Sequence, residues 1–70
     1  MEPKTQVGKN IKAHRARLGI TQEEAAHRAG LHPVEFGRAE RGTRDLRVST
    51  VVRIARGLGV PAGELLRELP

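Results

Sequence analysis

The sequence contains no cysteine, tryptophan or tyrosine, and its one phenylalanine is Phe36. Disulfide bonds and cysteine-based zinc sites are therefore excluded, and the core has to be built almost entirely from aliphatic side chains. The chain also lacks an apolar run near the ~20 residues that a membrane span requires, and its first residues do not resemble a secretion signal. We therefore expect a soluble, cytoplasmic protein without membrane contacts.

Side chains suited to catalysis or to metal binding are scarce as well. No nucleophile stands at a usable spacing from a base, and no two carboxylates share a helix face as an acid–base pair requires. The histidines, His14, His27 and His32, fall on three different predicted segments without a cysteine, which disfavours a zinc site. We expect no enzymatic activity, no bound metal and no other cofactor.

Charge is plentiful, and it is unevenly distributed along the 70 residues. Lysine and arginine together number 13 against 8 acidic residues, which gives a formal net charge of +5. Residues 1–20 and residues 41–60 each carry five basic side chains and one acidic, whereas residues 21–40 carry two basic and four acidic. Two basic blocks around a mildly acidic centre favour a polyanionic partner, with nucleic acid first.

Apolar residues recur with a helical period along the whole chain, and no stretch shows the alternation of a strand. Val7, Ile11 and Leu18, for example, form one stripe on a helix that Gly19 ends. The length suits one small domain, so we predict a single all-α domain spanning residues 1–70. Its five predicted helices cover residues 5–18, 22–29, 33–40, 48–58 and 62–69.

The second and third predicted helices are bounded by strong local signals. Thr21 and Glu24 have the spacing of a capping box, in which the threonine hydroxyl accepts from the glutamate N–H and the carboxylate reaches back to the threonine N–H. Gly30 suits the left-handed conformation that ends a helix, and Pro33 is favoured at the first position of the next one. Two short helices around a glycine-containing turn indicate a helix-turn-helix motif.

Four segments between Val7 and Leu69 extend this pattern over nearly the whole chain: VGKNIKAHRARLGITQEEAA, RAGL, ERGTR and VVRIARGLGVPAGELL. In combination they resemble the Cro and lambda-repressor type (XRE-like) helix-turn-helix family. The resemblance implies a five-helix, lambda-repressor-like DNA-binding domain. It further implies a sequence-specific transcriptional regulator, a repressor or controller protein, that binds an inverted-repeat operator in double-stranded DNA as a homodimer.

The resemblance also implies roles for individual positions. It places base readout on the solvent face of the third helix, at His32, Pro33, Val34, Glu35 and Arg38. It implies phosphate contacts from the start of the second helix and from the segment after the third, at Gln22, Arg41, Thr43 and Arg44. Arg15 and Glu40 match a structural ion pair that ties the first helix to the end of the third.

Several positions depart from the family pattern. Pro33 and Val34 replace polar residues at the front of the recognition helix, which reduces direct hydrogen bonding to bases there. Arg47 stands where a serine or threonine commonly caps the fourth helix, so we expect Asp45 or Ser49 to cap it instead.

Apolar residues near the end of the sequence exceed what five short helices need in their core. We expect Val52, Leu66 and Leu69 to form a homodimer surface, because one small module buries little DNA surface and two half-sites supply the rest. The alternative is an antitoxin-type protein-interaction module that neutralises a partner protein and regulates its own operon. A long disordered tail would favour that alternative, and these residues contain none.

Overall fold

The computed structural model describes residues 1–69, and these residues form five helices and no strand. The helices are α1 (Pro3–Leu18), α2 (Gln22–Ala29), α3 (Pro33–Arg41), α4 (Val48–Leu58) and α5 (Ala62–Leu65). The predicted all-α fold class is therefore confirmed. Pro70, the last residue of the predicted domain, lies outside the described residues.

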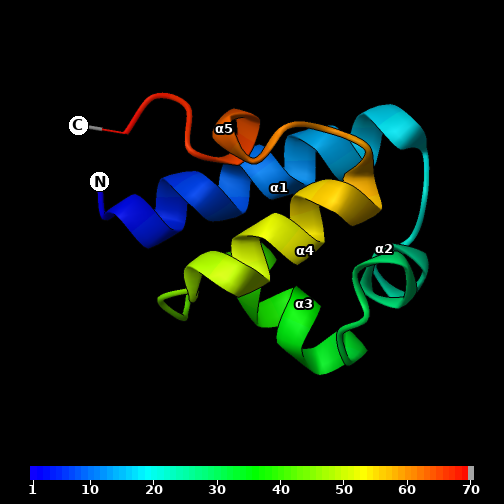
Figure 1. Cartoon of the computed structure of the whole chain (residues 1–70). Coiled ribbons are helices and arrows are strands. Elements are labelled where there is room, and N and C mark those ends of the chain that lie inside the picture. Colours follow the sequence, from blue (N-terminus) through cyan, green and yellow to red (C-terminus); the bar gives the residue numbers. More distant parts are fainter. Residues whose placement is uncertain (70) are drawn as a thin grey trace.

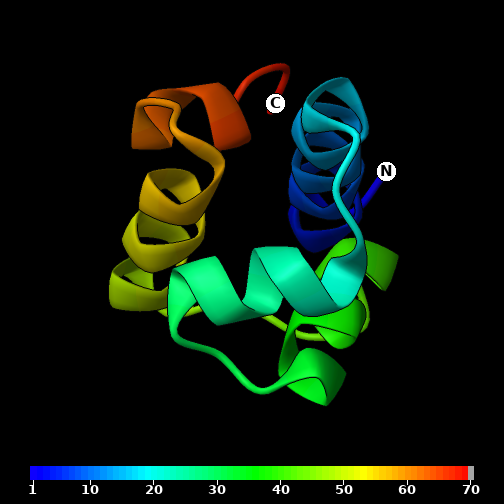
Figure 2. The ribbon, with the colours of Figure 1, turned by 90° about the vertical axis from the view of Figure 1, so that its right-hand side faces the viewer.

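The helices pack so that α3 and α5 lie on opposite sides of the molecule (Figure 1). α2 packs against α4 and α3, while α3 also packs against α1. Figure 2 shows α2 running across the front of the molecule, with α3 below it and α5 at the top. This arrangement leaves the outer face of α3 uncovered by the other helices.

A single core joins all five helices of the described chain. Its largest fully buried side chains come from four different helices: Phe36, Ile11, Ile54 and Leu65. α2 contributes only alanines, Ala25, Ala26 and Ala29, which let its backbone approach the neighbouring helices closely. The one aromatic ring of the chain thus anchors the inner face of α3.

The start of α2 agrees with half of the predicted capping box. The Thr21 hydroxyl accepts from the Glu24 N–H at 3.0 Å, as expected. The Glu24 carboxylate, however, accepts from Arg28 Nε at 3.0 Å, one turn further along the helix. An oppositely charged side chain four residues away therefore takes the carboxylate that was expected to cap Thr21.

The start of α1 and the end of α3 differ slightly from the prediction, whereas α4 has the predicted bounds, residues 48–58, but not the expected cap. α1 begins at Pro3, two residues before the expected start, because proline suits the first turn of a helix. α3 extends one residue further, to Arg41, before Gly42 ends it. Neither Asp45 nor Ser49 caps α4, which begins after Arg47 without a side-chain cap hydrogen bond.

The largest boundary error concerns α5, which ends at Leu65 rather than at residue 69. The Asn10 side chain of α1 donates to the Leu65 carbonyl at 3.0 Å and to the Arg67 carbonyl at 2.9 Å. Glu68 then adopts a left-handed φ of 64°, which is incompatible with a continuing helix. The segment after α5 therefore turns, and Leu69 packs partly buried against the core.

Leu18 does not belong to the core, although the apolar stripe of α1 predicted it there. Its side chain is 45% exposed, whereas Val7 and Ile11 of the same stripe are buried. Leu18 instead lines surface hollows together with Leu58 and Gly59 at the end of α4. Within residues 1–69, none of the helices has the length and apolar character needed to cross a bilayer.

α1 and α3 approach each other most closely at Gly8. A Cβ atom at this position would lie 2.5 Å from the Glu40 carbonyl oxygen and 2.7 Å from the Ala39 carbonyl oxygen. Both neighbours are backbone atoms, so we expect Gly8→Ala to destabilise the fold by about 2 kcal/mol through overpacking. Denaturant unfolding followed by circular dichroism measures this loss.

Gly63→Ala is the matched control for Gly8→Ala. Apart from its chain neighbours and the backbone of its own helix, no described atom lies within 4 Å of a Cβ built at Gly63, so this variant should unfold at the wild-type concentration of denaturant or above it. Equal midpoints for the two variants would show that the close contact at Gly8 does not exist in solution.

Candidate nucleic-acid interface

α3 begins with a reciprocal cap formed by His32 and Glu35. The Nδ1 atom of His32 accepts from the Val34 N–H at 3.2 Å, and the Glu35 carboxylate accepts from the His32 N–H at 3.2 Å. Pro33, the first helical residue, has no N–H to satisfy. The front of α3 is therefore well ordered by its own side chains, with His32 and Glu35 both engaged.

The two faces of α3 differ sharply in burial. Phe36 and Ala39 point into the core, and Glu40 is buried beside them. The five residues predicted to read bases are all exposed: His32, Pro33, Val34, Glu35 and Arg38. Spacings of three and four residues separate a buried stripe from an exposed one on the same helix. α3 is thus anchored on one side and presents these five side chains on the other.

The buried carboxylate of Glu40 is the meeting point of three segments. Arg15 of α1 contacts it with two guanidinium nitrogens, Nε on Oε2 and Nη2 on Oε1, the latter at 3.2 Å. Gln22 of α2 donates its side-chain N–H to Oε1 at 2.8 Å. Arg15 also donates to the Ile20 carbonyl at 2.9 Å, in the turn before α2. The pair therefore links α1, the start of α2 and the end of α3.

The electrostatic environment of Arg15 favours its charged form. The hydrogen bond that Arg15 donates to Glu40, together with the charge of that carboxylate, raises the pKa of Arg15 above its ordinary value, and this outweighs the opposing effect of burial. A raised pKa means that the stabilising contribution of the charge is fully present below the ordinary pKa of arginine. It is lost only as the pH rises through the still higher folded value, so the pair persists at neutral pH.

Gln22 occupies a different position from the one expected of a simple phosphate contact. One of its two amide N–H groups is used by Glu40, and its side chain is half-buried. The partner lies 18 residues away in sequence, so no local pattern could have revealed this contact. The second amide N–H is the group left for an outside acceptor.

The last residue of α3 and the segment after it hold the remaining predicted phosphate contacts. Arg41 and Arg44 are exposed. Thr43 donates both its backbone N–H and its hydroxyl to the Arg38 carbonyl, each at 3.2 Å. The hydroxyl of Thr43 therefore helps to satisfy the last turn of α3.

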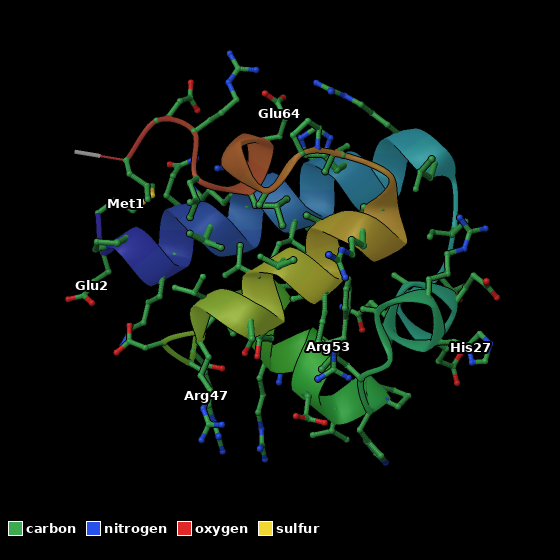
Figure 3. All side chains as sticks on the ribbon, viewed as in Figure 1. Met1, Glu2, His27, Arg47, Arg53 and Glu64 are labelled. Carbon is green, nitrogen blue, oxygen red and sulfur yellow. The ribbon has the colours of Figure 1, made fainter. Side chains whose placement is uncertain are left out.

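A cavity of about 410 Å³ lies between α3, the following loop and the start of α4. Four arginines line it, and they come from three elements: Arg38, Arg44, Arg47 and Arg53. Figure 3 shows the Arg47 side chain extending from the start of α4 towards the side on which α3 lies. Two acidic residues, Glu35 and Asp45, also line it, so the hollow beside the exposed face of α3 has a lining with an excess of basic side chains.

Arg47 and Arg53 were not among the predicted site residues. The signal for Arg47 was its unusual presence at the position where a serine or threonine commonly caps the fourth helix. Arg53 gave no local signal, because its backbone partners lie 23 and 24 residues earlier in the chain.

The three histidines lie on different elements and have different surroundings. His14 of α1 lies 3.8 Å from the Glu64 carboxylate of α5, His27 lies on the exposed side of α2, and His32 caps α3. Figure 3 shows Glu64 at the top of the molecule and His27 at its right-hand edge. In the part of the chain that the structure describes, no three histidine, cysteine or acidic side chains are grouped as metal ligands.

A family model described as a helix-turn-helix domain matches residues 6–69. The chain belongs to this helix-turn-helix family. Over 66 residues the helix-turn-helix chain is 36% identical to an uncharacterised HTH-type transcriptional regulator, y4dJ, of Sinorhizobium fredii, with 94% of this chain and 86% of the relative covered. It is 30% identical over 66 residues to the control protein C.SmaI of Serratia marcescens, with 94% and 79% covered.

Solved structures agree with this assignment. The restriction-modification controller protein C.AhdI from Aeromonas hydrophila matches with a TM-score of 0.85 at 27% identity. The match covers 89% of the helix-turn-helix chain and 94% of the controller protein. The resemblance seen in the sequence is therefore confirmed at the level of family and fold.

Replacing Arg15 tests the buried pair of this helix-turn-helix domain. Arg15→Ala leaves the Glu40 carboxylate, which is 3% exposed, with only Gln22 as a side-chain partner. Loss of one partner of a buried ion pair costs about 3 to 5 kcal/mol, so we expect a large fall in melting temperature. Arg17→Ala, on the exposed side of α1, removes the same charge and should change the melting temperature little. Similar melting temperatures for both variants would contradict the buried pair.

Proposed function

We propose that this helix-turn-helix protein is a sequence-specific DNA-binding transcriptional regulator, of repressor or controller type. The supporting observation is the division of α3, whose inner face is anchored by Phe36 and Glu40 while five side chains on its outer face are exposed beside a basic cavity. An exposed helix of this kind fits the major groove of B-DNA, with flanking cations on the phosphates. The regulator and controller names of the relatives favour this proposal over an antitoxin-type module.

The chemistry of α3 suggests how bases are read. Arg38 suits the O6 and N7 acceptors of guanine, and Val34, which is 50% exposed, suits the methyl group of thymine. Because Nδ1 of His32 accepts a backbone N–H, its neutral ring carries the proton on Nε2, which makes that atom a donor for a base acceptor. Glu35 is engaged in the cap, so its proposed contact with cytosine N4 competes with the His32 N–H.

Phosphate contacts flank this reading surface in the proposal. Arg41 is the last residue of α3, Arg44 lies in the loop after it, and Arg44 and Arg47 line the same cavity. Gln22 offers its second amide N–H at the start of α2, where the helix terminus favours anions. Thr43 acts through α3, because its hydroxyl already donates to the Arg38 carbonyl. These contacts set the register of α3 without reading sequence.

We propose that the regulator binds an inverted-repeat operator as a homodimer. One small module buries about 600 to 1,000 Å² on DNA, and a second half-site about one helical turn away supplies the rest. Leu66 is 45% exposed and Val48 is 81% exposed, whereas Val52 is half-buried and Leu69 packs partly against the core. The proposed surface therefore centres on Leu66, with smaller shares for Val52 and Leu69.

Arg38→Ala and Arg44→Ala separate base reading from phosphate contact. After selection of random duplexes with the wild-type protein, we expect Arg38→Ala to cost about 1 to 3 kcal/mol at one base position of the enriched site. Arg44→Ala should weaken all duplexes alike and reduce the slope of log K against log salt by about one. Binding titrations across a salt series measure both effects. Failure to enrich any sequence would refute sequence-specific binding.

Leu66→Glu tests the proposed dimer. A carboxylate at the centre of an apolar contact should weaken self-association by at least about tenfold, as truncating central interface residues does. Leu18→Glu is the control, because Leu18 has the same exposed fraction, 45%, and lies at the end of α1. Sedimentation equilibrium at micromolar concentration gives the dissociation constants. A wild-type protein that is monomeric there, with and without its selected duplex, would contradict the proposal.

A further inference from the structure

Arg53 of α4 reaches back to the turn of the helix-turn-helix motif. Its Nε donates to the Ala29 carbonyl at 3.2 Å, and its Nη2 donates to the Gly30 carbonyl. Figure 3 shows this side chain between α4 and the segment that joins α2 to α3. Its two bonded nitrogens are thus committed to the backbone that immediately precedes the recognition helix.

The end of α2 needs these donors. The Gly30 N–H bonds to the Ala26 and His27 carbonyls, and the Leu31 N–H donates to the Ala26 carbonyl at 2.9 Å. The carbonyls at the end of a helix lack partners within it and have to find them elsewhere. Arg53 supplies donors for the last two, with a positive charge at the negative end of the helix.

A second contact from α4 meets the same stretch of backbone. Gly57 lies one turn after Arg53, and a Cβ there would be 2.9 Å from the Ala29 nitrogen and 3.0 Å from the Arg28 carbonyl carbon. Gly30 has a φ of 69°, and a Cβ on it would lie 3.0 Å from Nη2 of Arg53. The last residues of α2 therefore pack on α4 at Gly57, and the Ala29 and Gly30 carbonyls that follow are hydrogen-bonded to α4 by Arg53.

We infer that Arg53 is a positioning residue for base recognition, and this inference rests on the proposed function. The turn between Gly30 and Pro33 sets the direction in which α3 leaves α2, and Arg53 fixes that turn to α4. Arg53 lines the same cavity as Arg38, yet its bonded nitrogens face backbone carbonyls rather than an outside anion. Its contribution is therefore to discrimination between DNA sequences more than to attraction of the phosphate backbone.

Arg53→Met and Arg53→Lys test this role, with Arg56→Met as the control. Arg56 is an exposed arginine three residues further along α4, so its replacement removes the same charge. Lysine carries the same charge but does not reproduce the planar, forked donor group of arginine. The amide exchange rates and the specificity of Arg53→Lys should therefore lie between those of the wild type and those of Arg53→Met. Melting temperatures establish the temperature range in which every variant is folded, and all other measurements are made within that range.

Two measurements then report on the opening of the turn and on the specificity of DNA binding separately. Amide hydrogen exchange at Gly30 and Leu31 reports whether the turn opens, without DNA. Dissociation constants for the selected duplex and for a scrambled duplex of equal length, over a salt series, give the specificity ratio. For Arg53→Met we expect faster exchange at both amides and a ratio reduced by about tenfold, with an unchanged salt slope. Arg56→Met should leave the exchange rates and the ratio at wild-type values.

Other outcomes would overturn the inference. Unchanged exchange would show that Arg53 does not hold the turn, and faster exchange with an unchanged ratio would show that the turn does not govern recognition. Equal weakening on both duplexes with a salt slope lower by about one would make Arg53 a phosphate contact. A wild-type protein without preference for any duplex would refute the proposed function, while the exchange rates would still decide whether Arg53 holds the turn.

Discussion

The buried carboxylate of Glu40 is the constraint on which the rest of the structure depends. A charge removed from water has to be paired and hydrogen-bonded, and here Arg15 and Gln22 together do this. Because these partners come from α1 and α2, satisfying one carboxylate fixes three helices relative to one another. The end of α3 is thereby oriented from inside the protein, and its outer residues remain available for contacts with another molecule.

Close helix packing compensates for the scarcity of large side chains. With a single aromatic residue in the core, the domain relies on small residues at the crossings: alanines along α2, Gly8 between α1 and α3, and Gly57 between α4 and α2. Each brings two backbones close together, which excludes water and raises the packing density around Phe36. The helix positions are consequently fixed by backbone contacts as well as by the apolar core.

The arginines of the chain show that one residue type serves several physical purposes. Arg15 neutralises a buried carboxylate, Arg53 satisfies backbone carbonyls, and Arg38 is exposed on the outer face of α3. Burial and hydrogen-bond partners decide among these roles, since the side chains are chemically identical. The formal net charge of +5 therefore does not measure how much positive charge faces a nucleic acid.

Local signals in the sequence determined the helical class, the turn at Gly30, the start of α3 at Pro33 and the alternation of its buried and exposed faces. Each of these depends on residues within about one or two helical turns, where spacing and side-chain type are decisive. Tertiary structure alone decided that Gln22 bonds to Glu40, that Arg53 bonds to the turn, that Leu18 is exposed and that α5 ends at Leu65. The hydrogen bonds of Gln22, of Arg53 and of Asn10 at the end of α5 each join residues that are between 18 and 57 positions apart in the sequence. Their geometry therefore exists only after the helices have packed.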